Sequence, residues 1–391
     1  MKTVYIVSAK RTPVGRFQGV FKNYSAPKLG AIAVKAAIEA SGISNTHIDE
    51  IIMGQVLTAG VGQAPARQAA LYAGLPESVQ ALTVGKVCGS GLKAVVLAAQ
   101  SILLNDSEIV VAGGQESMTN APYCLPLARD GMRMGHKEIM DTMIHDGLWD
   151  PYNNIHMGNC AELCAKEFNF SRQEQDQFAK ESYLRARKAM ENGLFKNELT
   201  SVTVVNGKVT TVVDTDEEPQ AADLNKMEQL RPAFEKEGTI TAANASKIND
   251  GAAALVLASE EAVKQYNLKP LAKIVSWAGH AQEPKWFTTA PVTAMQRALQ
   301  KAQLSANEID LFEINEAFAL VTLAAMKKLE IPHTKVNIHG GACAIGHPIG
   351  ASGARILTTL VHSLLQYKKK YGLATLCIGG GEGIAMIIER V

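Results

Sequence analysis

Gly91-Leu92-Lys93-Ala94-Val95 resembles a second stretch of the chain, Gly353-Ala354-Arg355-Ile356-Leu357, at an offset of 353 − 91 = 262 residues. Ile48-Asp49-Glu50-Ile51-Ile52 matches Ile309-Asp310-Leu311-Phe312-Glu313 at an offset of 310 − 49 = 261 residues. Val111-Ala112-Gly113-Gly114 resembles Cys377-Ile378-Gly379-Gly380 at an offset of 379 − 113 = 266 residues. Three matches in the same order at nearly one offset indicate two copies of one structural unit.

Both copies show alternating strand and helix patterns. The first copy predicts strands near 4–9, 82–87 and 108–112, with helices near 26–41 and 91–104. The second copy predicts strands near 271–277, 311–315 and 375–378, with helices near 291–302 and 352–367. Alternation of this length favours an α/β fold with mostly parallel or mixed sheets covered by helices.

A long insertion interrupts the first copy. In the second copy an apolar strand at 383–388 returns directly after the glycines, but the equivalent strand at 251–257 follows Gly114 only after about 135 residues. We therefore expect an N-terminal half of residues 1–117 plus 250–268, an inserted loop domain of 118–249 and a C-terminal half of 269–391. Within the insertion, Ser171-Arg172-Gln173-Glu174 predicts a capped helix start and Asn192-Gly193 its end.

Charge and composition exclude several classes of protein. The 391 residues carry 39 basic and 38 acidic side chains, and no long basic run appears, so we expect no nucleic-acid partner. No apolar run reaches the roughly 18 to 20 residues that span a bilayer, and the N-terminal apolar run is too short for a signal peptide. We expect a cytoplasmic protein without a membrane partner, whose six dispersed cysteines form no disulfide framework.

Cys88 is the first candidate for chemistry. It stands in Val87-Cys88-Gly89-Ser90-Gly91, between an apolar strand and the helix 91–104. The free N–H groups of a helix N-terminus lower a thiol pKa and can hold an oxyanion. Flanking glycines favour a nucleophile over the alternative, a small buried hydrophobe.

His347 stands in the corresponding turn of the second copy. Gly346-His347-Pro348-Ile349-Gly350 precedes the helix 352–367, which is the repeat partner of the helix after Cys88. The histidine is either satisfied by the backbone of its turn or transfers protons near neutral pH. Because duplicated halves tend to present equivalent helix starts to one cleft, the pairing with Cys88 favours proton transfer.

Two further residues end buried strands. Cys377 precedes Gly379-Gly380-Gly381 and is either a core residue or a second thiol that donates and accepts a proton. Asn315 precedes Glu316-Ala317-Phe318, where it either caps a helix or fixes a water that faces the cleft.

A metal or nucleotide cofactor is not expected. His156, Cys160 and Cys164 recur every four residues and could share a helical face, but no fourth ligand stands nearby. The glycine runs match neither a phosphate-binding loop nor a complete dinucleotide fingerprint.

Taken together, these segments resemble the thiolase family over essentially the whole chain. The resemblance rests on six motifs: Arg11-Thr12-Pro13, Gly62-Gln63-Ala64-Pro65-Ala66-Arg67-Gln68, Lys86-Val87-Cys88-Gly89-Ser90-Gly91, Asn315-Glu316-Ala317-Phe318-Ala319, Gly346-His347-Pro348-Ile349-Gly350 and Cys377-Ile378-Gly379-Gly380-Gly381. It implies two duplicated α/β halves with mixed five-stranded sheets covered by helices, and a loop domain inserted into the first half. It also implies a homotetramer built as a dimer of dimers.

The resemblance assigns catalytic roles. Cys88 would take an acetyl group from acetyl-CoA, and His347 would activate it. Cys377 would remove the α-proton of a second acetyl-CoA, and Asn315 would hold a water that stabilises the enolate oxygen together with His347. The backbone N–H groups of Cys88 and Gly379 would form the second oxyanion hole. The products would be acetoacetyl-CoA and CoA.

The resemblance also implies contacts with coenzyme A, whose thioesters are substrates, so no cofactor is expected. His156 and Ser246 would approach the thioester end, within apolar walls that comprise Leu148, Phe234, Ala317 and Phe318. Ile155-His156-Met157-Gly158 resembles the short-chain biosynthetic branch of the family.

Several positions depart from the family pattern. They are Gly85, Gln220, Ala243, Lys247, Trp286, Phe287 and His339. None removes a catalytic group, but they bear on the rate, on CoA affinity and on substrate length. Three alternatives therefore stay open: a degradative thiolase for longer 3-ketoacyl chains, a catalytically idle acyl-CoA-binding homologue, and a hydrolase built from Cys88, His347 and Asn315.

Overall fold

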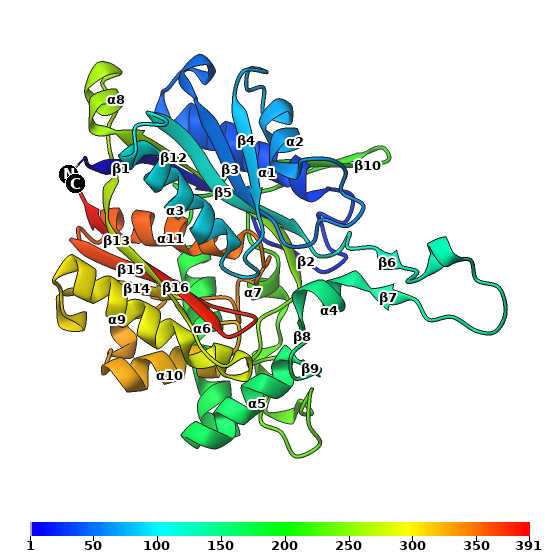
Figure 1. Cartoon of the computed structure of the whole chain (residues 1–391). Helices are drawn as coiled ribbons and strands as arrows, with labels where there is room; N and C mark the ends of the chain where they lie inside the picture. The colour runs from blue at the N-terminus through cyan, green and yellow to red at the C-terminus, as the bar shows by residue number, and fades with distance from the viewer. Residues whose placement is uncertain (1) are drawn as a thin grey trace.

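The computed structural model describes residues 2–391 and places both copies in one mixed sheet (Figure 1). The first copy contributes β1 (Val4–Arg11), β3 (Glu50–Gly54), β4 (Gln80–Val84), β5 (Ile109–Ser117) and β12 (Asn249–Ser259). The second contributes β13 (Ala272–Ala281), β14 (Leu311–Ile314), β15 (Tyr371–Ile378) and β16 (Glu382–Arg390). Their order is β14-β15-β16-β13-β1-β12-β5-β3-β4.

The pairing pattern of the two halves is the same. β3 pairs with β5 in parallel, β5 with β12 and β12 with β1 antiparallel; β14, β15, β16 and β13 repeat this order and these directions. Within the sheet formed by residues 2–391, the strands of the two halves pair where β1 meets β13, through Tyr5 with Lys273 and Ile6 with Ala272. The α/β fold of two duplicated halves is therefore confirmed.

The halves differ in their fifth strand. β4 completes the first half by pairing in parallel with β3. In the second half a single parallel bridge between Phe312 and Val336 stands where β4 stands in the first. The second half thus has four strands and one bridge instead of the expected five strands.

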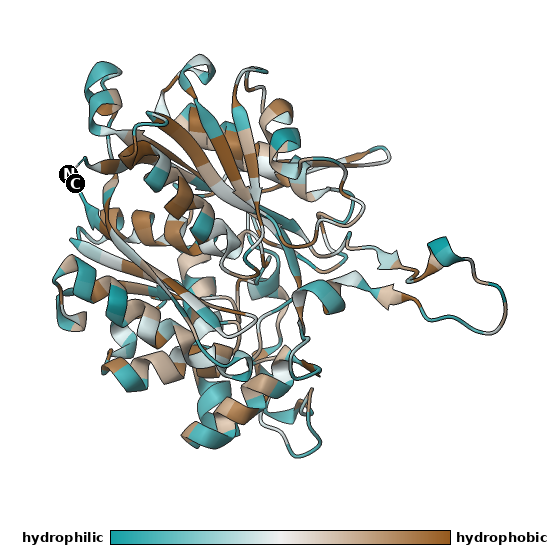
Figure 2. Ribbon diagram, in the orientation of Figure 1, coloured by the Kyte–Doolittle hydropathy of each residue, from teal (hydrophilic) through white to brown (hydrophobic). Residues whose placement is uncertain are grey.

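The helices form three layers around the two halves of the sheet. α3 (Ser90–Leu103) and α11 (Ser352–Gln366) pack against each other in the middle (Figure 1). α1 (Ala26–Ser41) and α2 (Pro65–Tyr72) cover the outer side of the first half, and α9 (Ala290–Ala302) and α10 (Ala319–Leu329) lie beyond the second half. In Figure 2 the hydrophobic colour is concentrated in the strands of the first half and in the central helices, whereas the outer helices carry more hydrophilic colour.

The two central helices touch at the glycines of the repeated motif. A Cβ on Gly353 would lie 2.3 Å from the backbone nitrogen of Leu92, and one on Gly91 would lie 2.8 Å from that of Ala354. Any larger residue would force the helices apart. Because both helices start at this contact, the turns that precede them, with Cys88 and His347, are brought to one place.

The segment between β5 and β12 adds several further elements. A long arm carries β6 (Tyr123–Cys124), η2 (Ala128–Asp130) and β7 (Met140–Asp141) away from the body of the molecule (Figure 1). The chain then forms α4 (Thr142–Gly147), β8 (Trp149–Asp150), β9 (Ile155–His156), α5 (Met157–Phe168) and α6 (Arg172–Glu191). Ser171 and Glu174 form the predicted capping box of α6. β10 (Val202–Asn206), β11 (Val209–Val213), α7 (Glu218–Ala221) and η3 (Leu224–Gln229) follow.

Two strand predictions needed correction. The expected strand 82–87 lies at Gln80–Val84, because the chain turns at Val87, whose φ is 43°. β3 was not among the predicted strands; its five residues are short, although its sequence belongs to one of the matched segments. Within residues 2–391, no helix is both long and apolar enough to cross a membrane.

A buried cluster of charged residues joins β1 to the segment between β5 and β12. Arg11 is fully buried; its Nη1 and Nη2 donate to the Asp216 carboxylate at 2.7 and 2.9 Å, and its Nε donates to Glu198 at 2.5 Å. Asp216 also accepts the N–H of Val14 at 2.8 Å. Each charge is paired and hydrogen-bonded, as burial requires.

Asp216→Ala should therefore destabilise the fold strongly. The substitution leaves the buried guanidinium with only one carboxylate, and we expect the free energy of unfolding to fall by about 3–5 kcal/mol. Urea unfolding followed by circular dichroism measures the loss. The control is Glu260→Ala, which breaks an exposed pair with Lys264 and should leave the midpoint near that of the unmodified protein. Equal urea midpoints for the two variants would contradict the stabilising role of the Arg11–Asp216 pair.

Candidate active site

A strained turn places Cys88 at the start of α3. Val87 has a left-handed backbone, which is costly for a β-branched residue. Ser90 Oγ closes the turn, because it donates to the carbonyl of Val87 at 2.7 Å and accepts the N–H of Lys86 at 2.8 Å. Gly89 lies close to Ile378, since a Cβ there would lie 2.4 Å from Ile378 Cδ1, so a larger residue would require the Ile378 side chain to move.

The Cys88 sulfur faces two backbone donors. The N–H groups of Gly379 and of Cys88 itself hydrogen-bond to it and lower the thiol pKa. Burial acts in the opposite direction and is the larger effect, so the pKa of Cys88 is raised to about 11. The expectation of a lowered thiol pKa was therefore wrong, because desolvation outweighs the donors at the helix start.

His347 is held as a neutral base. Its Nδ1 lies 2.6 Å from Ser352 Oγ, which donates its own hydrogen to the carbonyl of Pro348 at 2.9 Å. Ser352 Oγ therefore accepts from Nδ1–H, which leaves Nε2 with its lone pair. Burial, together with the charge of Arg355, lowers the pKa of His347 to about 3. The resting site thus contains a neutral imidazole and a neutral thiol.

Cys377 lies near Cys88, and Asn315 lies near His347. Cys377 is fully buried near the end of β15, and burial raises its pKa, with a further contribution from the nearby Cys88. Asn315 follows β14 and its Nδ2 lies 3.4 Å from His347 Nε2. Asn315 does not cap α10, because Phe318 occupies that position. Its buried Oδ1 has no hydrogen-bond partner within residues 2–391.

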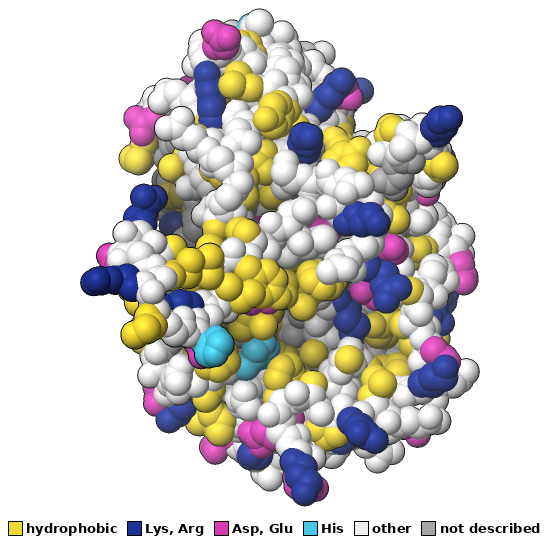
Figure 3. Space-filling model, turned by 90° about the vertical axis from the view of Figure 1, so that its right-hand side faces the viewer, with side chains coloured by type: hydrophobic (Ala, Val, Ile, Leu, Met, Phe, Trp, Pro, Cys, Tyr) yellow, Lys and Arg dark blue, Asp and Glu magenta, His cyan; other side chains and the backbone are white. Residues whose placement is uncertain are grey.

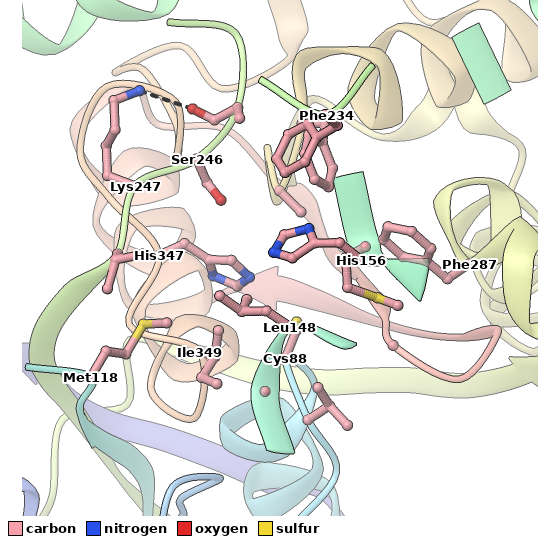
Figure 4. Close-up of a pocket in the computed structure, with 18 residues that line it drawn as sticks. Cys88, Met118, Leu148, His156, Phe234, Ser246, Lys247, Phe287, His347 and Ile349 are labelled. Atoms are coloured by element: carbon pink, nitrogen blue, oxygen red, sulfur yellow. Dashed lines mark hydrogen bonds between the residues drawn. The ribbon is translucent and has the colours of Figure 1, made fainter. Parts of the chain in front are cut away.

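A cavity of about 260 Å³ opens onto Cys88 and His347 (Figure 4). Its lining includes Cys88, His347, Gly379, His156, Ser246, Leu148, Phe234, Ala317 and Phe318, nine of the predicted site residues. The other two, Cys377 and Asn315, are not part of the lining. On the face that carries the arm, hydrophobic side chains gather in a band around a hollow (Figure 3).

Further lining residues were not predicted as contacts. They include Met118, Ile349, Ile248 and Met157, together with Lys247 and Phe287, which the sequence analysis identifies only as departures from the family pattern. Ile349 lies within the histidine turn and could have been found from that motif. Met118 follows β5, and only the folded arrangement brings it to the cavity.

His156 presents a donor to the cavity. Its Nδ1 accepts the N–H of Gly158 at 3.0 Å, so Nε2 is free to donate. The ring stacks on Phe234 with 4.8 Å between centroids, and burial lowers its pKa. In Figure 4 the imidazole of His156 faces the same space as that of His347.

His156, Cys160 and Cys164, which recur every four residues, do not converge as metal ligands. Across residues 2–391, no group of three or more His, Cys, Asp or Glu side chains is placed to hold a metal ion. Cys160 and Cys164 are buried in the apolar cluster beneath α5, and His156 caps that helix through Gly158.

A thiol, a neutral imidazole and two converging N–H groups in an apolar cavity form a site for acyl transfer through a cysteine. The sequence model of the thiolase N-terminal domain matches residues 4–261, and that of the thiolase C-terminal domain matches residues 268–390. The chain therefore belongs to the thiolase family, a family of acyltransferases.

Several known proteins are similar to this chain over its full length. An acetyl-CoA acetyltransferase of Cupriavidus necator is 52% identical over 392 residues, which cover 100% of both chains. One of Pseudomonas aeruginosa is 50% identical, again over 100% of both, and one of Yarrowia lipolytica is 50% identical over 100% of this chain and 97% of its own.

The raised pKa of Cys88 predicts how alkylation depends on pH. Thiolate is the reactive form, and its fraction increases about tenfold per pH unit below the pKa. We expect the rate of iodoacetamide reaction at Cys88 to keep rising from pH 7 to pH 10, as followed by mass spectrometry of the Cys88 peptide. A plateau below pH 8 would show a preformed thiolate and contradict the assignment.

Proposed function

We propose that this chain joins two molecules of acetyl-CoA into acetoacetyl-CoA and CoA, and catalyses the reverse reaction. The observation that carries the proposal is the neutral pair of Cys88 and His347 beside the N–H groups of Cys88 and Gly379 in a small apolar cavity. The names of the full-length relatives agree with it.

In the first half-reaction, His347 Nε2 takes the proton of the Cys88 thiol. The thiolate attacks the carbonyl carbon of acetyl-CoA, and the two N–H groups stabilise the oxyanion. The bond between carbonyl carbon and CoA sulfur breaks, and the Cys377 thiol donates its proton to the departing sulfur. The enzyme then holds acetyl-Cys88, an imidazolium at His347 and a thiolate at Cys377.

In the second half-reaction, the Cys377 thiolate removes an α-proton from another acetyl-CoA. The imidazolium stabilises the enolate oxygen, together with a water for which Asn315 Oδ1 offers a buried acceptor. The enolate carbon attacks acetyl-Cys88, the bond to the Cys88 sulfur breaks, and His347 returns its proton to that sulfur. Every group is thereby restored.

The cavity walls favour short acyl chains. Phe287 and Phe318 are buried, with 6.4 Å between their ring centroids, and both line the cavity. We place the thioester end against His156 and Ser246, with Leu148, Phe234 and Ala317 as apolar neighbours. The coenzyme A thioesters are substrates, and the proposed reaction needs no cofactor.

We further propose a homotetramer in the cytoplasm. The arm supports an assembly, because it exposes large apolar side chains that include Leu127 and Met134, at 71% and 89% exposure. A relative in Gibberella zeae, 48% identical, is named as cytosolic. The domain bounds, 1–117 plus 250–268, 118–249 and 269–391, and the binding of CoA by the inserted segment 118–249 stay predictions.

A comparison of substrates tests the proposed reaction. We expect rapid cleavage of acetoacetyl-CoA by CoA and at least a tenfold lower kcat/KM for long-chain 3-ketoacyl-CoA, since one misfitting methylene costs about 1–3 kcal/mol. Mass spectrometry should find an added acetyl group on Cys88 after mixing with acetyl-CoA. A preference for long chains would support the degradative alternative, and an unlabelled Cys88 the idle homologue.

Cys377→Ala should separate the two half-reactions. Without the second thiol no base removes the α-proton, so we expect acetoacetyl-CoA formation to fall by at least about a hundredfold. Acetylation of Cys88 should largely persist, because the CoA sulfur can depart as a thiolate without a proton from Cys377, and it is read by mass spectrometry. Cys160→Ala, which removes another buried thiol, serves as the control and should retain condensation. Full condensation activity of Cys377→Ala would reject the role of Cys377.

A further inference from the structure

Lys247 combines a cavity-lining stem with an ammonium that points away from the cavity (Figure 4). Its Nζ donates to the carbonyl oxygens of Ala242, Ala245 and Cys343 at 2.5, 2.9 and 3.3 Å. The Tyr183 ring lies on another side, with 5.6 Å from Nζ to the centroid. All three N–H groups are therefore satisfied, and an aromatic face adds cation–π attraction.

Two of these carbonyls, those of Ala242 and Ala245, belong to the turn 242–245, whose end forms part of the cavity wall. Ala245 and Ser246 both line the cavity. The turn is attached on its other side to the segment before α10, because Ser246 N–H donates to Ala317 at 3.0 Å and Ala319 N–H donates to Asn244 at 2.8 Å. The ammonium thus bridges the carbonyls of Ala242 and Ala245 across this turn.

The third carbonyl belongs to the segment that leads to His347. From Gly341 onward the backbone forms consecutive turns, in which Ile345 N–H donates to Gly341 at 2.8 Å and Gly346 N–H donates to Ala342 at 3.1 Å. His347 N–H then donates to Asn249 Oδ1 at 2.9 Å. The 242–249 segment is consequently joined twice to the 343–347 segment, by Lys247 at Cys343 and by Asn249 at His347.

We propose that Lys247 is a positioning residue, whose ammonium acts as a fixed cation between the 242–245 turn and Cys343 and so holds Ser246 and His347 in register across the cavity. A neutral side chain of similar length would leave three carbonyls without their donor. The kinetic part of this inference rests on the proposed function, whereas the binding of a cation in place of the ammonium does not.

Chemical rescue tests the proposal. Lys247→Ala opens a space bounded by the three carbonyls and the Tyr183 ring, which ammonium or methylammonium ions can enter. We expect turnover of acetoacetyl-CoA, normalised to Cys88 sites titrated with iodoacetamide, to fall about ten- to a hundredfold, because small misplacements of reacting groups cost that much. Ammonium chloride should restore at least a tenth of the lost rate saturably, whereas sodium chloride of equal ionic strength should not.

A thermal shift gives a readout that does not depend on catalysis. Ammonium should raise the melting temperature of Lys247→Ala above the value in sodium chloride and leave the unmodified protein unchanged. The matched control is Lys335→Met, since Lys335 Nζ also donates to backbone carbonyls, of Asn307 and Ile309 at 3.0 and 2.8 Å, but does not line the cavity. It should retain normal turnover per titrated site.

Three results would overturn the proposal: normal turnover per site in Lys247→Ala, absence of any ammonium-specific effect on both rate and melting temperature, or an equal loss in Lys335→Met. If Lys247→Ala does not fold, Lys247→Met takes its place, because methionine preserves the volume of the stem. Its turnover per titrated site must be reduced, and ammonium must not restore it. An unmodified protein that lacks thiolase activity would refute the proposed function, while the melting temperatures of Lys247→Ala would still decide whether the site takes a cation.

Discussion

The close contact of α3 and α11 determines where the chemistry takes place. Gly91 and Gly353 are equivalent residues of the two copies, and the backbone of each helix occupies the space that a side chain would need on the other. Because the contact lies at the second residue of each helix, the two helices start close together. The turns before them therefore meet, and each turn supplies one reactive group, the thiol of Cys88 or the imidazole of His347.

Burial then determines how these groups react. Desolvation raises the thiol pKa to about 11 and lowers the imidazole pKa to about 3, so separated charges are disfavoured at rest. An acyl-transfer step that moves one proton from Cys88 to His347 creates both charges at once, beside N–H groups already aimed at the sulfur and the oxyanion. The apolar cavity makes those fixed dipoles more effective than water would be.

Some features of the structure can be predicted from local sequence patterns, whereas others depend on contacts that form only in the folded chain. The repeat, the helices and the capping box at Ser171 follow from spacing and residue type, and the structure confirms them. The sign of the Cys88 pKa shift could not be predicted, because it is the balance of burial against two N–H groups that only the fold brings together. The sequence shows Lys247 only as a departure from the family pattern. Its contacts could not be predicted, because one of its carbonyl partners, Cys343, lies 96 residues away in the chain.

The duplication also explains why the site is asymmetric. At the repeat offset, Cys88 corresponds to residue 88 + 262 = 350 and His347 to residue 347 − 262 = 85, and both positions are glycine. The steric constraint differs between them: a Cβ on Gly350 would lie 2.8 Å from the backbone Cα of Gln55, whereas one on Gly85 would have its nearest neighbour at 3.9 Å. The turn that carries His347 therefore has no room for a second thiol at the equivalent position. The turn that carries Cys88 does have room for a side chain at residue 85, so the glycine there reflects no steric requirement of the fold.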